Sequence, residues 1–130
     1  MIRVFFDGKC NICLKEINYY KRVSPKGIFQ WIDITNENKI LKIENIELVD
    51  CLKILHVKDS KGKLYKGISG FIVIWKNLKG WKVLAFVVSL PIIFHFATML
   101  YNLFAVWRFN KLEHCKIALS NKKINKYYFM

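Results

Sequence analysis

The feature that most restricts the fold is a strand-like run that gives way to a helical pattern at a pair of cysteines. Residues 2–6 are β-branched and aromatic and end at Asp7 and Gly8, which predicts a short buried strand. Over residues 10–23 the apolar positions recur at helical spacing, and a Ser-Pro-Lys-Gly stretch at 24–27 ends this pattern. A strand followed directly by a helix favours the α/β class.

The rest of the chain continues this alternation and then becomes helical. The expected elements are a strand at 28–34, a short helix over 35–43 capped by Thr35 or Asn36, an irregular or single-turn link at 45–50, a strand at 51–58, a strand at 64–66, and helices from 67 to about 110. The turn residues at 59–62 predict that the last two strands form a hairpin. The order predicts a β-α-β unit and a β-hairpin in one sheet, with additional C-terminal helices.

One segment allows two interpretations. Residues 83–107 form a stretch of 25 residues without a formal charge, and about 20 apolar residues suffice for a membrane-spanning helix. Against a span, Pro91 interrupts the stretch, and His95, Thr98 and Asn102 form a polar stripe at helical spacing. We therefore expect a soluble helical hairpin broken near Pro91, with membrane insertion or peripheral attachment as the alternative. Five apolar side chains are expected to pack inward: Phe96, Leu100, Leu103, Phe104 and Trp107.

Length and charge limit the remaining possibilities. The 130 residues are enough for one domain, which we expect over residues 1–115, followed by a basic aromatic tail at 116–130 whose last ten residues, 121–130, are expected to be mobile. The formal net charge is +13, but only three of the 22 basic residues are arginine, and the lysines are scattered. This pattern is typical of a solvated basic surface, so no nucleic-acid partner is expected. No secretory signal is recognised at the N-terminus, which predicts a cytoplasmic protein with reduced thiols.

The clearest chemical signal is the C-x-x-C formed by Cys10 and Cys13. Three residues make nearly one helical turn, so both sulfurs should lie on one helix face, within reach of reversible disulfide formation. Cys10 at the helix start, next to Lys9, should be favoured as thiolate by the helix dipole. We expect Cys10 to be the exposed nucleophile and Cys13, one turn further inside, to be the more buried resolving thiol.

These residues resemble a known family. Phe6-Asp7-Gly8-Lys9-Cys10-Asn11-Ile12-Cys13 is similar to the Asp, Cys, Cys signature of the DCC family of predicted thiol-disulfide oxidoreductases. The stretch 59–67, with Tyr65 and Gly67, resembles the family's hairpin, the stretch 101–108 resembles its C-terminal helix, and Cys115 lies near its late cysteine. The resemblance covers about residues 2–115. It implies a thioredoxin-like fold and thiol-disulfide exchange.

The other candidate residues have structural interpretations beside their chemical ones. Asp7 either accepts a proton during thiol exchange or accepts N–H bonds in the turn after the strand. Cys51 is expected to be a small buried hydrophobe rather than a third redox thiol. Zinc is a minority alternative, with two candidate ligand sets: Cys10, Cys13 and Cys51 with His56, or the same thiols with His114 and Cys115. Neither set has the usual zinc spacing, so no metal and no cofactor are expected.

The sequence thus predicts a small thiol-disulfide oxidoreductase that uses a Cys10/Cys13 couple, with Asp7 as a third site residue. Its expected substrate is a disulfide-containing protein or a small thiol. The alternative is a non-enzymatic module on the same fold that binds a protein or lipid partner, with peripheral membrane contact.

Overall fold

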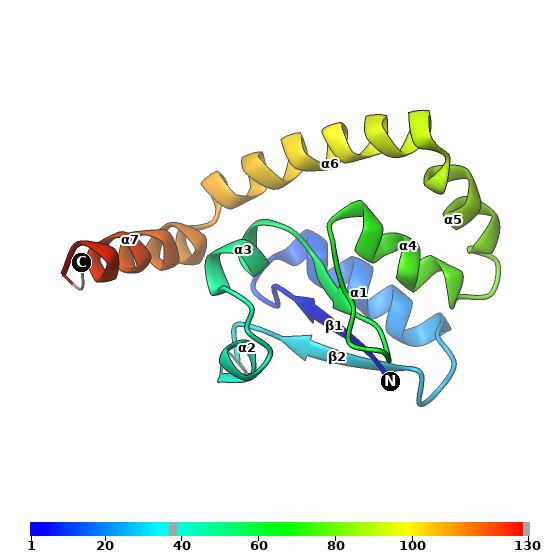
Figure 1. The fold of residues 1–130 in the computed structure, drawn as a ribbon, viewed down its shortest axis with the longest axis horizontal. Helices are drawn as coiled ribbons and strands as arrows, with labels where there is room; N and C mark the ends of the chain where they lie inside the picture. The colour runs from blue at the N-terminus through cyan, green and yellow to red at the C-terminus, as the bar shows by residue number, and fades with distance from the viewer. Residues whose placement is uncertain (37–38, 129–130) are drawn as a thin grey trace.

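The computed structural model describes residues 1–36 and 39–128, with side chains described through Asn121. One mixed sheet lies between two groups of helices (Figure 1). The elements, in chain order, are β1 (Ile2–Phe6), α1 (Asn11–Val23), β2 (Phe29–Asp33), α2 (Lys39–Ile43), α3 (Leu48–Lys53), β3 (His56–Lys58), β4 (Leu64–Lys66), α4 (Ile68–Lys76), α5 (Lys82–Ser89), α6 (Pro91–Lys111) and α7 (Glu113–Tyr128).

The four strands lie in the order β2-β1-β3-β4. β1 pairs in parallel with β2 and antiparallel with β3, and β3 forms an antiparallel hairpin with β4. Parallel β1 and β2 need a long connection, which α1 provides. The predicted β-α-β unit and hairpin in one sheet are therefore confirmed, and this mixed α/β architecture is consistent with a thioredoxin-like fold.

The alternation of side chains along β1 creates a core on each face of the sheet. Val4 and Phe6 are buried with Ile17 of α1 and Ile74 of α4. Phe5 points to the opposite face and is buried among residues of α3, α6 and α7. The site residues at the end of β1 therefore lie between two packed layers.

The prediction of a strand over residues 51–58 was wrong in its first half. Only His56–Lys58 is a strand, and Leu48–Lys53 forms α3, so Cys51 lies on a helix. Val49, Cys51 and Leu52 are all buried there. A short apolar run fits a buried strand and a buried helix equally well, and only the packing on the sheet distinguishes them.

The uncharged segment forms two helices, as predicted, with the break between Ser89 and Pro91. Within the described residues, α6 is the one helix long and apolar enough to cross a membrane by length and composition. The prediction of its inner face was wrong, because four of the five side chains expected inside are 49 to 63% exposed: Phe96, Leu100, Leu103 and Trp107. The helix is apolar on nearly all sides, so its periodicity could not identify the buried face. His95 and Asn102 are exposed, as expected of a polar stripe, but Thr98, its third member, is half-buried and its hydroxyl oxygen is buried without a hydrogen-bond partner among the described residues.

The C-terminal part of the chain is helical. α7 runs from Glu113 to Tyr128, so the domain boundary predicted after residue 115 falls inside this helix. The segment contains no proline or glycine that would end a helix. Residues 129–130 of the predicted tail lie outside the described residues.

Candidate active site

Both cysteines of the C-x-x-C lie at the start of α1, directly after the turn that follows β1. Cys10 is the N-cap of the helix, and its Sγ accepts a hydrogen bond from the backbone N–H of Cys13 at 3.4 Å. The Cys10 N–H donates to the main-chain oxygen of Asp7 at 3.3 Å. The sulfur of Cys10 therefore faces the unpaired N–H groups of the first helical turn, where negative charge is stabilised.

The turn leaves no room for a side chain at Gly8. The Gly8 N–H donates to Asp33 Oδ1 at the end of β2 at 3.0 Å, and a Cβ on Gly8 would lie 1.8 Å from Asp33 Oδ2. The same Asp33 carboxylate accepts the N–H of Thr35 at 2.9 Å. Glycine at this position is therefore favoured by the close approach of the Asp33 carboxylate, rather than by an unusual backbone angle.

The carboxylate of Asp7 is 4% exposed and is held by groups from both ends of the chain. Its Oδ1 accepts the N–H of Lys9 at 3.0 Å, which is the expected turn role. Arg108 Nη1 donates to its Oδ2 at 3.2 Å, and His114 Nε2 lies 2.8 and 2.9 Å from the two oxygens. Two cationic or donor side chains, separated from Asp7 by more than 100 residues, thus surround one buried carboxylate.

Arg108 connects three elements beside the thiols. Besides Asp7, its guanidinium donates to the main-chain oxygens of Leu52 and Lys53, which are the unpaired carbonyls at the end of α3. Burial alone lowers the pKa of Arg108, but the nearby sulfurs of Cys13 and Cys10 and the Asp7 carboxylate outweigh it and raise that pKa. The site therefore holds a fixed positive charge next to both cysteines.

The exposure of the two thiols is the reverse of the prediction. Cys10 is 2% exposed, whereas Cys13 is half-buried and lines a cavity. Burial and the hydrogen bond with Cys10 raise the pKa of Cys13, and Arg108 only partly opposes them. At the N-cap position, the sulfur of Cys10 turns back toward the first turn of α1. Cys13, three residues further along the helix, lines the cavity instead.

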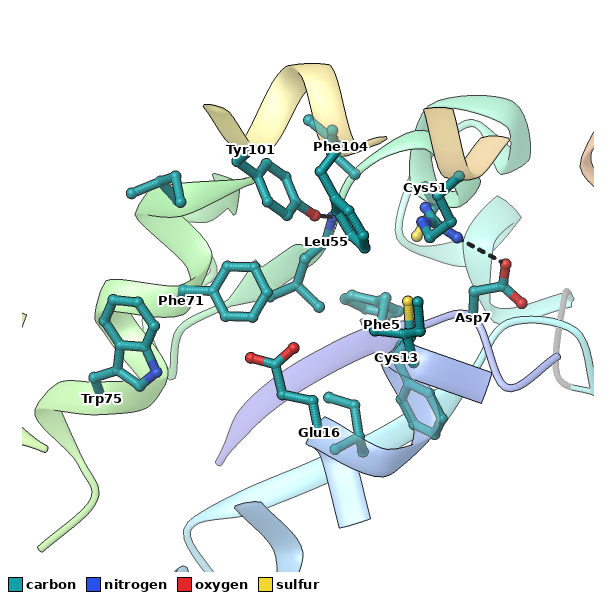
Figure 2. A pocket seen from close by; sticks show the side chains of 16 residues that line it. Phe5, Asp7, Cys13, Glu16, Cys51, Leu55, Phe71, Trp75, Tyr101 and Phe104 are labelled. Atoms are coloured by element: carbon teal, nitrogen blue, oxygen red, sulfur yellow. Dashed lines mark hydrogen bonds and ion pairs between the residues drawn. The ribbon is translucent and has the colours of Figure 1, made fainter. Parts of the chain in front are cut away.

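The cavity has a volume of about 290 Å³ and lies between α1, α3, α4 and α6. Cys13, Cys51 and Arg108 line one part of it, and Figure 2 shows Phe71 and Trp75 on the side away from Cys13 and Asp7. Its walls are mostly apolar, with a few polar groups near the sulfurs, which is typical of a site for an organic or peptide ligand.

The third and fourth cysteines are buried and protonated at neutral pH. Burial, with the charge of Asp7, raises the pKa of Cys51 to about 12, in agreement with its interpretation as a small hydrophobe. Burial raises the pKa of Cys115 to about 11, and its Sγ lies 3.8 Å from Asp7 Oδ2. Neither thiol is a ready nucleophile.

The structure does not bring the first candidate zinc set together. His56 lines a separate pocket under α2 and α3, away from the cavity beside Cys13. In the described part of the chain, one group places three ligand atoms within 4.8 Å, namely Asp7, His114 and Cys115. Arg108 already donates to the Asp7 carboxylate in this group. The positive guanidinium therefore neutralises the negative charge that a metal ion would need.

A model of the DCC1-like thiol-disulfide oxidoreductase family matches residues 4–113. The chain belongs to this family. The matched range contains Asp7, Cys10, Cys13 and Arg108, whereas His114 and Cys115 fall just beyond it. No curated protein and no solved structure matches the chain. The resemblance identified from the DGxCxxC motif is therefore confirmed at the level of the family.

Sequence reasoning missed the partners of Asp7. Arg108 was recognised only as part of a helix similar to the family's C-terminal helix, and His114 only as a candidate zinc ligand. The available signal was the position of Arg108, the first charged residue after 25 uncharged ones. A charged side chain at the end of an apolar helix that packs on a domain requires a buried partner.

Proposed function

We propose that this protein is a small thiol-disulfide oxidoreductase that cycles between a Cys10/Cys13 dithiol and the corresponding disulfide. Family membership supports the class of reaction. The observation that carries the assignment to these residues is the position of Cys10 Sγ, which accepts the Cys13 N–H at the start of α1 beside buried Arg108. Backbone N–H donors at the start of a helix and a nearby cation are the surroundings in which cysteines typically act as nucleophiles.

Cys10 is the attacking thiol in this proposal, and Cys13 resolves the intermediate. Exposure alone would favour Cys13, but a protonated thiol does not attack, and the raised pKa of Cys13 keeps it protonated at neutral pH. The guanidinium lies beside both sulfurs, but only Cys10 Sγ accepts a backbone N–H at the start of the helix. In this proposal a substrate approaches through the cavity that Cys13 lines, although Cys10 itself is not one of the lining residues.

The exchange is a two-electron reduction of the substrate disulfide. The Cys10 thiolate attacks one substrate sulfur, a mixed disulfide forms, and the other substrate sulfur leaves as a thiolate that takes up a proton. Cys13 then loses its proton and attacks Cys10 Sγ, which releases the second substrate thiol and leaves the Cys10–Cys13 disulfide. An external dithiol returns the protein to its reduced form, and the same steps in reverse oxidise a substrate dithiol.

Asp7 supports both steps. It orders the turn before Cys10 through the Lys9 N–H and holds Arg108 beside the sulfurs. It also lines the cavity with Cys13, so it is the carboxylate we assign to accept the Cys13 proton in the resolving step. The substrate class is a protein disulfide or a small disulfide that fits an apolar cavity.

Trapping of the mixed disulfide tests the proposal. With a disulfide substrate such as oxidised glutathione or insulin, Cys13→Ser should accumulate an adduct on Cys10, because attack proceeds and intramolecular release does not. Cys10→Ser should form none, and the parent protein, which keeps both thiols, serves as the control that cycles without accumulating an adduct. An adduct on Cys13 in Cys10→Ser would reverse the assigned roles. If Cys13→Ser forms no adduct and the parent keeps both thiols reduced, the oxidoreductase proposal is rejected in favour of the non-enzymatic binding module.

A further inference from the structure

The outer face of the α5–α6 hairpin is apolar and has no partner in the described part of the chain. Six large side chains on it are 59 to 85% exposed: Val83, Phe86, Ile92, Phe96, Leu103 and Val106. Figure 1 shows α6 along one side of the molecule, with α5 turning back from its first residue toward α4. Monomeric proteins rarely expose so large a continuous apolar surface unless it binds something.

The inner face of α6 is fixed to the domain by polar contacts. Tyr101 accepts the Leu55 N–H through its hydroxyl at 3.0 Å, and Arg108 forms its ion pair with Asp7 at 3.2 Å. A helix that crossed a bilayer would have to give up these contacts and expose a guanidinium to lipid. The helix is therefore built to contact an apolar phase along one side only.

The chain segment that carries this face is basic. Between Asp59 and Glu113 the chain has no acidic residue and eight basic ones. Lys79 and Lys82 are exposed where α5 begins, and Lys111 is exposed at the end of α6, with its Nζ 4.7 Å from the Trp107 ring centre. Lysine and tryptophan at the ends of an apolar helix face are typical of helices that lie at a membrane surface.

We propose that the outer face of the α5–α6 hairpin binds the surface of an anionic lipid bilayer, with α6 parallel to the membrane plane. The apolar side chains would enter the boundary between headgroups and acyl chains, and the lysines at both ends would contact lipid phosphates. A second copy of the chain fits this face less well, because an isologous pair brings the same lysines together without any acidic partner in the segment.

Vesicle flotation of the full-length protein tests this proposal. Binding is expected to vesicles containing phosphatidylglycerol, and little to vesicles of phosphatidylcholine alone. The double variant Phe96→Glu, Leu103→Glu should lower the partition coefficient at least about tenfold, because it places two charges on the inserted face. Ile43→Glu is the matched control, since Ile43 is 81% exposed on α2, and it should bind like the parent.

A second pair of variants, equal to each other in net charge, tests whether the position of the lysines matters. Lys82→Glu, Lys111→Glu should weaken binding at least about tenfold, whereas Lys15→Glu, Lys42→Glu, the same change at exposed positions on α1 and α2, should change it far less. Circular dichroism melting of each variant verifies that the fold is intact.

Several results would overturn the proposal. These are no binding to anionic vesicles at low salt, equal binding by the Phe96→Glu, Leu103→Glu variant, or equal loss in both lysine pairs. A gel-filtration dimer that this apolar-face variant abolishes, without vesicle binding, would assign the face to a second copy. Resistance of bound protein to alkaline extraction would indicate a membrane span instead.

Discussion

The guanidinium of Arg108 lies 3.2 Å from the carboxylate of Asp7, although 101 residues separate them in the chain. The pair joins the end of β1, which positions the cysteines, to the end of α6. Both side chains are nearly fully buried, and Arg108 also satisfies two carbonyls at the end of α3. The geometry of the thiol site and the attachment of the C-terminal helices therefore depend on the same side chain.

Replacement of Arg108 should strongly destabilise the fold. Arg108→Ala leaves a buried carboxylate without its guanidinium, a change that costs about 3–5 kcal/mol. Arg108→Lys should recover only part of this free energy of unfolding. The planar guanidinium contacts Asp7 and the α3 carbonyls at the same time, and the compact ammonium group of lysine cannot do so. Urea unfolding measures the loss in free energy of unfolding for both variants. The control Arg22→Ala removes an exposed arginine and should change stability by less than about 0.5 kcal/mol. A loss below 1 kcal/mol for Arg108→Ala would contradict the buried pair.

A methyl group at Gly8 should disturb the turn before Cys10. The added Cβ of Gly8→Ala would meet the Asp33 carboxylate, so this carboxylate must move and give up the N–H groups of Gly8 and Thr35, which should disturb the turn before Cys10. We expect lower stability in urea and slower disulfide exchange. The double variant Gly8→Ala, Asp33→Gly should be less destabilised than the sum of the two single changes, because the clash is then absent. Additive effects would show that the close approach is not what requires glycine.

His56 should make the fold sensitive to mild acid. The ring is 1% exposed, its Nδ1 is 2.9 Å from the main-chain oxygen of Ile54, and burial lowers its pKa below 6.5. Below pH 6.5 the unfolded chain takes up a proton that the folded protein does not, so stability falls as the pH falls, by up to about 1.4 kcal/mol per pH unit. In urea titrations at pH 7, 6 and 5, the free energy of unfolding of His56→Gln should fall less with decreasing pH than that of the parent protein. Parallel losses in both proteins would assign the acid sensitivity to other groups.

Local patterns predicted the β-α-β unit and the hairpin, because period-two and helical spacing are properties of neighbouring residues. The same reasoning failed at Cys51, where a short apolar run carried no periodic information. It failed again on α6, since nearly every side of that helix is apolar and the inner face is selected by tertiary contacts such as those of Tyr101 and Arg108. The cluster at Asp7 joins residues from the two ends of the chain. The position of Arg108 after 25 uncharged residues indicates that it needs a partner, but a single sequence does not say which residue that partner is.

The four thiols should differ sharply in their rate of alkylation. The pKa values of Cys13, Cys51 and Cys115 are all raised, chiefly by burial, so these three are protonated at neutral pH. Cys10 alone accepts a backbone N–H at the start of a helix. A limiting amount of iodoacetamide at pH 7, followed by peptide mass spectrometry, should therefore label Cys10 first, although it is the less exposed member of the pair. Folded Arg108→Lys should show a smaller difference in alkylation rate between Cys10 and the other thiols, because the ammonium group of lysine is held less rigidly beside the sulfurs. Labelling of Cys13 before Cys10 would mean that access, and not thiolate stabilisation, decides which sulfur reacts.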